Sequence, residues 1–372
     1  MSNIPKSRTD GRLRDGLWIK QLPSGYTPTQ IVRWLSKIAF PKPISEEDIP
    51  TFETNLENLC ILMRLQMVTF PFENTPMHYT SHRTMDISPE AVFQRLVVEG
   101  KGCYCFGLNQ LFLQMIRGLG YRAYSGAGRI NEEPPNAPVI FLSFVHMVIF
   151  VQPDENSNIT YLVDATGGGT GLTRPILLAD GQMVMGATST ETHTLIRTTR
   201  SDSSLEPSLG SCENAKVEWH LIVRHQKNSD GPPTERTMYS FIEDEFYPTD
   251  YTTANIAVYT KQSGLFWENV VCSKSFWLSD VEMLELMGED CEEECKNVPP
   301  SRRFMGRLGM EGNIVRRHIG SRSDVIRVMN TEAERADALR DIFGIDITQD
   351  DLAFMKGRAP AFEGFPKTLE NM

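Results

Sequence analysis

The chain has 372 residues, 40% hydrophobic and 23% charged, a mixture typical of a globular protein with two or three domains. Its formal net charge of −11 argues against general nucleic-acid binding but leaves room for one anionic ligand held by a local basic cluster. No apolar run approaches the roughly 18 residues that span a bilayer, so no membrane segment is expected. Seven cysteines, an odd number, and the lack of an N-terminal apolar signal favour a reducing, cytoplasmic compartment.

The N-terminal third is expected to be a disordered arm followed by a helical domain. Residues 1–25 show no periodic apolar pattern and predict the arm, whereas residues 26–120 carry apolar side chains at helical spacing. Ser88 and Pro89 are a favoured N-cap and first helical residue. The expected helices cover residues 31–40, 52–68, 88–97 and a stretch from about Cys105 to Gly118 or Gly120.

The period changes after Gly120, where β-branched and aromatic residues become frequent. The expected strands lie at residues 121–130, 139–151, 159–165 and 217–224. Glycine- and proline-containing connections separate them, which predicts a small β-barrel domain over residues 121–235. The polar stretch 198–216 is interpreted as an exposed loop.

The last third, residues 236–372, is expected to form a mixed α/β domain. Residues 241–260 and 266–278 are interpreted as short strands alternating with turns. A helix is predicted over residues 331–344, because Thr331 can cap it, Glu334 completes a capping box and Gly344 can end it. The acidic run 288–294 is interpreted as solvated surface.

The segment GKGCYCFGLN, residues 100–109, carries the strongest chemical signal. Small residues lead directly into a helix, which places Cys105 at or near a helix N-terminus, where the helix dipole and unpaired N–H groups favour an anion such as a thiolate. The alternatives are a buried structural cysteine and a nucleophilic Cys103, which lies in the turn where the dipole helps less.

His146 interrupts an apolar strand, and Asp164 ends the following strand. If the polar turn between these strands is centred on Glu155, directly paired residue numbers sum to 310, and 146 + 164 = 310. Such a pair points to one face of the sheet, which predicts an Asp164–His146 hydrogen bond. A cysteine with a base and an orienting carboxylate is the usual form of an activated thiol nucleophile. A purely structural histidine–aspartate pair is the alternative.

Several motifs together resemble the arylamine N-acetyltransferases, and more particularly their fungal homologues. The family pattern RGGxCxExN corresponds to KGCYCFGLN here, which places Cys105 at the nucleophile and Asn109 at the closing asparagine. HMVIFV resembles the segment of the catalytic histidine, His146, and YLVDATGGG resembles that of the catalytic aspartate, Asp164. Further similar segments are FPFEN at 70–74, GLGYRAYSGAGRI at 118–130 and residues 245–271.

The resemblance implies an α+β fold around a core like that of cysteine proteases and transglutaminases, with a helical bundle, a β-barrel and an α/β lid. It implies that Glu73 pairs with Lys101. It also implies substrate-binding roles for Phe72, Arg129 and Ile130, and a loop for coenzyme A made by Thr166, Gly167 and Gly168.

The resemblance also implies ping-pong transfer of a short acyl group from acyl-CoA, through a Cys105 thioester, to an arylamine, hydrazine or arylhydroxylamine. Acetyl-CoA and malonyl-CoA are the expected cosubstrates, propionyl is also open, and no permanently bound cofactor is expected. The departures from the family pattern are Lys101 for arginine, Cys103 for the second glycine, Gly107 for glutamate or glutamine, and Thr166-Gly167 for Gly-Phe. They spare the three catalytic residues and bear on donor and acceptor selectivity.

Two other function classes remain open from sequence: a cysteine hydrolase or amidase with the same three residues, and a non-catalytic binding homologue. No metal site is predicted. The pairs His78–His82 and Cys291–Cys295 have i, i+4 spacing but lack further ligands. The cluster GGGTG at 167–171 is not a phosphate-binding P-loop, because no GK[ST] follows it. The oligomeric state is left open.

Overall fold

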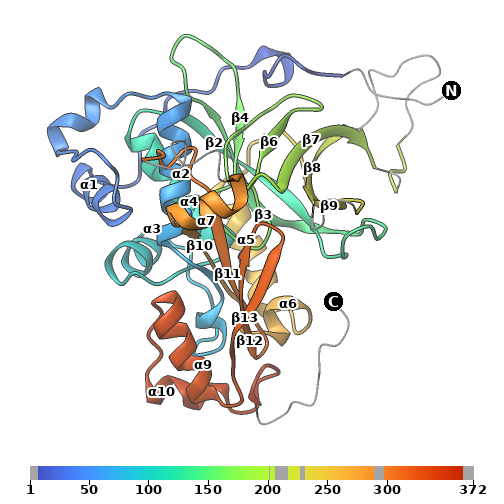
Figure 1. Ribbon diagram of the computed structural model, residues 1–372. Coiled ribbons are helices and arrows are strands. Elements are labelled where there is room, and N and C mark those ends of the chain that lie inside the picture. The colour runs from blue at the N-terminus through green and yellow to red at the C-terminus, as the bar shows by residue number, and fades with distance from the viewer. Residues whose placement is uncertain (1–6, 201, 206–216, 227–230, 289–296, 363–372) are drawn as a thin grey trace.

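The computed structural model describes residues 7–200, 202–205, 217–226, 231–288 and 297–362 (Figure 1). Its N-terminal part contains α1 Pro28–Lys37, α2 Leu56–Thr69, α3 Pro89–Phe93 and α4 Cys105–Gly118. Short 3₁₀ turns lie at Arg14–Gly16, Glu46–Thr51 and Thr75–Met77, and a π-helical turn continues α3 over Gln94–Val98. Thr27 caps α1 through a capping box, and Asn55 caps α2, so both helices begin at residues suited to that position.

An eight-stranded antiparallel sheet curls into a barrel that is nearly closed, with strand order β5-β4-β3-β2-β9-β8-β7-β6 (Figure 1). Its strands are β2 Arg122–Asn131, β3 Phe141–Gln152, β4 Tyr161–Val163, β5 Ile176–Leu177, β6 Met183–Met185, β7 Glu191–Thr199, β8 Val217–His225 and β9 Thr234–Phe241. The long β2–β3 hairpin lies at the centre of this order, and α4 packs against both of its strands. The barrel therefore presents its central strands to the helix that begins at Cys105.

The second sheet has five antiparallel strands in the order β1-β10-β11-β12-β13. Its strands are β1 Phe72–Glu73, β10 Cys272–Trp277, β11 Met305–Glu311, β12 Ile314–Ile319 and β13 Arg322–Val328. The accompanying helices are α5 Pro248–Thr260, α6 Leu265–Glu268, α7 Asp280–Met287, α9 Glu332–Ala338 and α10 Gln349–Leu352, with a π-helical turn at Leu339–Phe343 and a 3₁₀ turn at Ala353–Met355. Because β1 belongs to the N-terminal part of the chain, this sheet ties the helical region to the C-terminal third.

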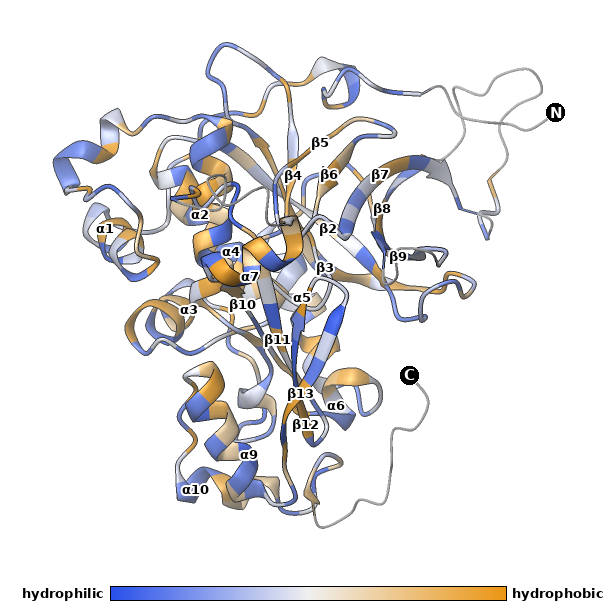
Figure 2. Cartoon of the chain, in the orientation of Figure 1, coloured by the Kyte–Doolittle hydropathy of each residue, from blue (hydrophilic) through white to orange (hydrophobic). Residues whose placement is uncertain are grey.

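The main hydrophobic core is shared by α2, α4 and the barrel strands. Apolar residues, coloured orange, recur along α2 (Figure 2). A second, smaller cluster lies between the five-stranded sheet and α9. No helix in the described ranges has the length and hydropathy needed to cross a membrane. In the same ranges, no group of three or more histidine, cysteine or acidic side chains is arranged to hold a metal ion.

The predicted disordered arm over residues 1–25 is wrong for residues 7–25. Ile19 is buried, and its backbone N–H donates to Gln152 Oε1 over 2.9 Å. Arg12 forms an antiparallel bridge with Ile159, and the N–H of Thr160 donates to the carbonyl of Gly11. The arm is ordered because it adds backbone partners to the β3–β4 connection. Residues 1–6 lie outside the described part of the chain.

Two further expectations are wrong in the C-terminal third. Residues 248–260, interpreted as strands and turns, form helix α5, with Pro248 in its first turn and the Asp250 side chain accepting from the Tyr247 N–H. The barrel domain does not end at residue 235, because β9 runs on to Phe241 and pairs with β2 and β8. The predicted helix at 331–344 is present as α9 and the π-helical turn, capped by Thr331 and ended by Gly344 in the left-handed conformation. Residues 206–216 and 289–296 lie outside the described ranges, so most of the predicted 198–216 loop and of the acidic run is not described.

Candidate active site

The turn before α4 crosses β1 at very short range. The N–H of Cys103 donates to the carbonyl of Pro71, and the N–H of Glu73 donates to the carbonyl of Cys103. A Cβ atom on Gly102 would lie 2.1 Å from the Pro71 carbonyl oxygen, so only glycine fits there. This crossing fixes the direction in which the chain enters the helix, and it makes Cys105 the first residue of α4.

Two of the departures from the family pattern compensate each other. The Cys103 side chain is fully buried, and a Cβ atom on Gly107 would lie 2.3 Å from the Cys103 sulfur. The missing side chain at residue 107 therefore provides the space that the thiol at residue 103 occupies. Because a well-packed interior tolerates little extra volume, the two residues must change together.

His146 and Asp164 form a buried hydrogen-bonded pair, with 2.8 Å between His146 Nε2 and Asp164 Oδ2. Burial opposes the imidazolium, but the Asp164 charge and hydrogen bond outweigh it and raise the pKa of His146 to about 10. Burial likewise opposes ionisation of Asp164, but His146 and hydrogen bonds from Asn109 and Thr166 lower its pKa. The protonated imidazole is therefore the resting form at neutral pH.

The predicted hydrogen bond is confirmed, but the predicted register is wrong. The pairs Ile149–Val163 and Phe150–Leu162 show that facing residue numbers sum to 312 (149 + 163), not 310. Asp164 follows β4 by one residue and lies diagonally across from His146 instead of directly opposite it. The shift of two residues preserves the strand face, so the two side chains still meet.

Cys105 and His146 are in contact at the point where α4 meets β3. Cys105 Sγ lies 3.6 Å from the carbonyl oxygen of Val145, the residue before His146, and a hydrogen bond with Cys105 contributes to the raised pKa of His146. Because Nε2 is bound to Asp164, Nδ1 is the ring nitrogen that is left to face the sulfur. Cys105, His146 and Asp164 are each at most 6% exposed, so the three groups meet in a site from which most water is excluded.

Asn109 completes this arrangement and was not assigned a function from the sequence. Its Nδ2 donates to Asp164 Oδ1 over 3.0 Å and to the Met147 carbonyl over 2.6 Å, and its Oδ1 accepts from the Ala165 N–H over 2.8 Å. Asn109 lies four residues after Cys105 on α4, so both point to the same helix face. That spacing was the available signal for a residue that holds the aspartate.

The pKa of His146 predicts how the pair contributes to stability. A histidine whose pKa is raised on folding stabilises the fold fully below its unfolded value of 6.5, and the contribution is lost as pH rises to about 10. We expect the difference in unfolding free energy between the wild-type protein and His146→Gln to be largest at about pH 6 and to shrink towards pH 10. Chemical denaturation across this pH range measures it, and a difference independent of pH would contradict the assignment.

The expected Glu73–Lys101 pair is wrong. Glu73, which is fully buried, pairs with Arg95 from the π-helical turn after α3. Arg95 Nε also donates to the carbonyl of Gly102 over 2.6 Å. Lys101 lies on the surface, with its Nζ 3.5 Å from Glu99. The guanidinium is therefore supplied from a different place in the chain, and it still holds the turn that precedes Cys105.

The other predicted site residues fall into two places. Phe72 lies beside Gly168, where a Cβ atom would approach its ring to 3.2 Å, and Thr166 hydrogen-bonds to Asp164. Gly167 has φ of +65°, which allows the sharp turn after the aspartate. On β2, Arg129 lies opposite Phe144 and Ser240, and its neighbour Ile130 lies opposite Tyr239. The ring of Tyr239 packs on His146 with 4.8 Å between centroids, another contact that the sequence did not predict.

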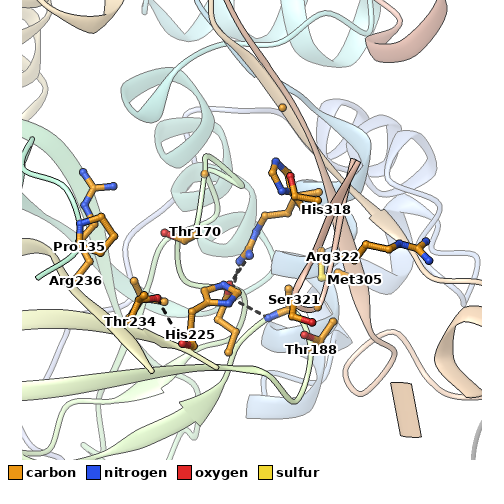
Figure 3. Close-up of a pocket in the computed structure, with 18 of the residues that line it drawn as sticks. Pro135, Thr170, Thr188, His225, Thr234, Arg236, Met305, His318, Ser321 and Arg322 are labelled. Atoms are coloured by element: carbon orange, nitrogen blue, oxygen red, sulfur yellow. Dashed lines mark hydrogen bonds and ion pairs between the residues drawn. The ribbon is translucent and has the colours of Figure 1, made fainter. Parts of the chain in front are cut away.

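A cavity of about 410 Å³ lies where the loop after Asp164 meets both sheets (Figure 3). Gly169 and Thr170 line it from the loop, together with residues at the ends of the barrel strands and from β11–β13, among them His225, Arg236, Arg307, His318 and Arg322. None of the three catalytic candidates lines this cavity. Three arginines line it, and the Glu191 carboxylate beside them is paired with Arg307 and His225.

Comparisons with known proteins identify the family of the chain. The N-acetyltransferase family model matches residues 55–291. An N-malonyltransferase of Fusarium pseudograminearum is 24% identical over 349 residues, which cover 90% of this chain and 93% of the relative. Arylamine N-acetyltransferase 1 of Mesocricetus auratus is 25% identical over 227 residues, covering 60% of this chain and 72% of the relative.

The fold is similar to that of a solved structure, the arylamine N-acetyltransferase of Mycobacterium marinum in complex with CoA. The TM-score is 0.62 at 21% identity, and the match covers 87% of this chain and 98% of that one. The family match spans more than half of the chain and includes Cys105, His146 and Asp164. The chain therefore belongs to the arylamine N-acetyltransferase family and is an acyltransferase.

Proposed function

We propose that the protein transfers a short acyl group from acyl-CoA to an arylamine, a hydrazine or an arylhydroxylamine through a thioester on Cys105. The observation that carries the proposal is the contact of Cys105, at the first turn of α4, with a His146 imidazolium that is held by Asp164. A sulfur at a helix N-terminus beside an imidazolium is in the environment that favours the thiolate. We also propose a cytoplasmic location, in keeping with the free thiols of Cys60, Cys103, Cys105 and Cys272.

The proposed reaction has two half-reactions, and together they return Cys105 and His146 to their starting protonation states. In the first, the Cys105 thiolate attacks the thioester carbonyl of acyl-CoA, the carbon–sulfur bond of CoA breaks, and CoA leaves with the proton held by His146. In the second, the amine attacks the Cys105 thioester, gives its proton to His146 and releases the thiolate. Asp164 holds the ring in place throughout and stabilises its charged form.

For coenzyme A we propose the loop of Thr166, Gly167 and Gly168 together with the adjoining cavity. The loop places small residues between Asp164 and the cavity, so a thin chain can pass close to the backbone. Arg236, His318 and Arg322 supply donors for phosphate groups at its far side. Such a path brings the thioester towards Cys105 while the nucleotide stays between the two sheets.

We propose that the donor is the CoA thioester of a short acyl group, and that acetyl, propionyl and malonyl are the candidates. The Fusarium relative, matched along nearly its whole length, is an N-malonyltransferase, whereas the Mesocricetus relative is an N-acetyltransferase. Phe72 is proposed to line the amine pocket, since its ring lies next to Gly168 and 6.0 Å from Phe266.

An acyltransferase and a hydrolase that use the same three residues differ in one respect: only the acyltransferase needs an amine acceptor for turnover of acyl-CoA. We expect the purified protein to release CoA from acyl-CoA in one burst, about one equivalent per enzyme, and then to turn over only when an arylamine is added, because the buried site excludes most water. CoA release followed with a thiol reagent, with and without an arylamine, measures this. Equal steady-state rates in both conditions would favour the hydrolase.

A further inference from the structure

Glu191, the first residue of β7, carries a buried carboxylate that three separate segments bind. It is 1% exposed, and its Oε1 accepts from the Ala187 N–H over 3.0 Å. Arg307 of β11 donates to both carboxylate oxygens, over 2.5 and 2.6 Å, and His225 Nε2 of β8 lies 2.7 Å from Oε2. Burial opposes ionisation of Glu191, but these partners outweigh it and lower its pKa well below the usual value. The carboxylate therefore joins the barrel to the five-stranded sheet.

The same group of side chains binds the end of the loop at residues 167–171. His193 Nε2 lies 2.9 Å from the carbonyl oxygen of Thr170, and Arg307 Nη2 donates to the carbonyl of Gly171 over 3.3 Å. Burial lowers the pKa of His193, so the ring is neutral at pH 7, and Nε2 must carry the proton because a carbonyl oxygen only accepts. His193 also lies against Glu191, with 3.9 Å between Nε2 and Oε1. Two adjacent carbonyls of the loop are thus bound by donors that Glu191 contacts.

The loop connects the proposed catalytic aspartate with the cavity and is rich in glycine. Gly167 and Gly169 have φ of +65° and +51°, and a Cβ atom on Gly169 would meet nothing within 4 Å. Such a segment loses much conformational freedom when it is ordered. The beginning of the loop is held by the hydrogen bond of Thr166 with Asp164. Its end, where the lining of the cavity begins, is held by His193 and Arg307.

We propose that Glu191, His193 and Arg307 are positioning residues that order this loop before acyl-CoA binds, and we name them the loop clamp. The clamp acts through two backbone carbonyls of the loop and does not touch the reacting atoms. This inference rests on the proposed function, in which acyl-CoA passes along the loop to Cys105. A loop that is already ordered binds its ligand without the cost of ordering, so the clamp should raise the affinity for acyl-CoA and leave the chemical step unchanged.

His193→Phe tests the clamp with the Glu191–Arg307 ion pair intact, because it removes only the donor to the Thr170 carbonyl and keeps a buried ring. Acylation of Cys105 by acetyl-CoA or malonyl-CoA is followed by rapid-mixing measurement of CoA release, without any amine. We expect the half-saturating donor concentration to rise about 5- to 20-fold, while the maximal acylation rate changes by less than about 2-fold. Titration calorimetry with CoA alone should show the same loss of affinity.

The double variant Glu191→Met/Arg307→Met separates positioning from a purely structural role. Replacing both partners of a buried ion pair with apolar side chains of similar size commonly leaves stability unchanged or raises it. We therefore expect a urea midpoint close to that of the wild type. The half-saturating donor concentration should nevertheless rise as it does in His193→Phe, because the Gly171 carbonyl has lost its donor.

His220→Phe is the matched control. His220 lies on β8, its ring packs on Phe141 with 5.1 Å between centroids, and its Nε2 has no hydrogen-bond partner among the described residues. This variant should bind CoA as the wild type does. A wild-type half-saturating concentration in His193→Phe, or in the folded double variant, would overturn the positioning role and leave the acyltransferase proposal standing. If neither donor acylates wild-type Cys105, the proposed function fails, and calorimetry with CoA still decides whether the clamp sets its affinity.

Discussion

A Cys105→Ser variant is expected to lose acyl transfer almost completely, with kcat/KM lower by about 10⁴-fold or more. A serine hydroxyl fits the space of the thiol, so the α4 N-terminus and the His146–Asp164 pair should remain as they are. The variant loses the nucleophile because a serine hydroxyl is a far weaker nucleophile than a cysteine thiol at neutral pH. The one-acyl adduct that is expected for the wild type by intact mass should be absent.

Cys103→Ala is the matched control for this prediction. Cys103 lies two residues earlier and is buried, and burial, which outweighs the opposing charge of Arg95, raises the pKa of its thiol to about 12. Alanine removes only the sulfur that faces Gly107, so we expect a modest loss of stability with the adduct on Cys105 preserved. An adduct that disappears in Cys103→Ala but persists in Cys105→Ser would assign the chemistry to the other thiol.

The meeting of the three proposed catalytic residues could be predicted because each lies in a local pattern with a physical cause. Small residues before an apolar helix indicated a helix N-terminus at or near Cys105, and a polar residue in an apolar strand marked His146. The strand period of two then placed Asp164 on the correct face even though the turn position was misjudged. An error of two residues in register leaves the face unchanged, and an error of one would have separated the pair.

Features that depend on contacts between distant segments were not predictable in this way. Arg95 reaches Glu73 because α3 ends in a π-helical turn and β1 crosses the turn before α4, and no local pattern encodes that crossing. Helix α5 is a different case, because Pro248 at the first position and Asp250 two residues later are ordinary helix-start signals. The tyrosine and threonine residues of the same segment favour strands, so its local signals conflict.

The Glu73–Arg95 pair, which is present instead of the expected Glu73–Lys101 pair, gives the largest predicted effect on stability. Glu73 has no exposed surface, and it accepts from Arg95 and, over 2.5 Å, from the N–H of Thr75. Removing one partner of such a buried ion pair leaves the other charge without compensation, so Glu73→Ala should lower the free energy of unfolding by about 3–5 kcal/mol. Lys101→Ala should cost no more than about 1 kcal/mol, since Lys101 and Glu99 form a surface pair.

Denaturant unfolding of both variants, together with Arg95→Met and the Glu73→Ala/Arg95→Met double variant, separates the two pairings. Coupling should appear between Glu73 and Arg95, with the double variant less destabilised than the sum of the single ones. Glu73→Ala should also slow acylation of Cys105, because Arg95 holds the Gly102 carbonyl in the turn that leads into α4. If Lys101→Ala destabilised the protein as much as Glu73→Ala and was coupled to it, Glu73 would pair with Lys101, as the family resemblance implies. Arg95 would then not replace the arginine that the nucleophile motif lacks at residue 101.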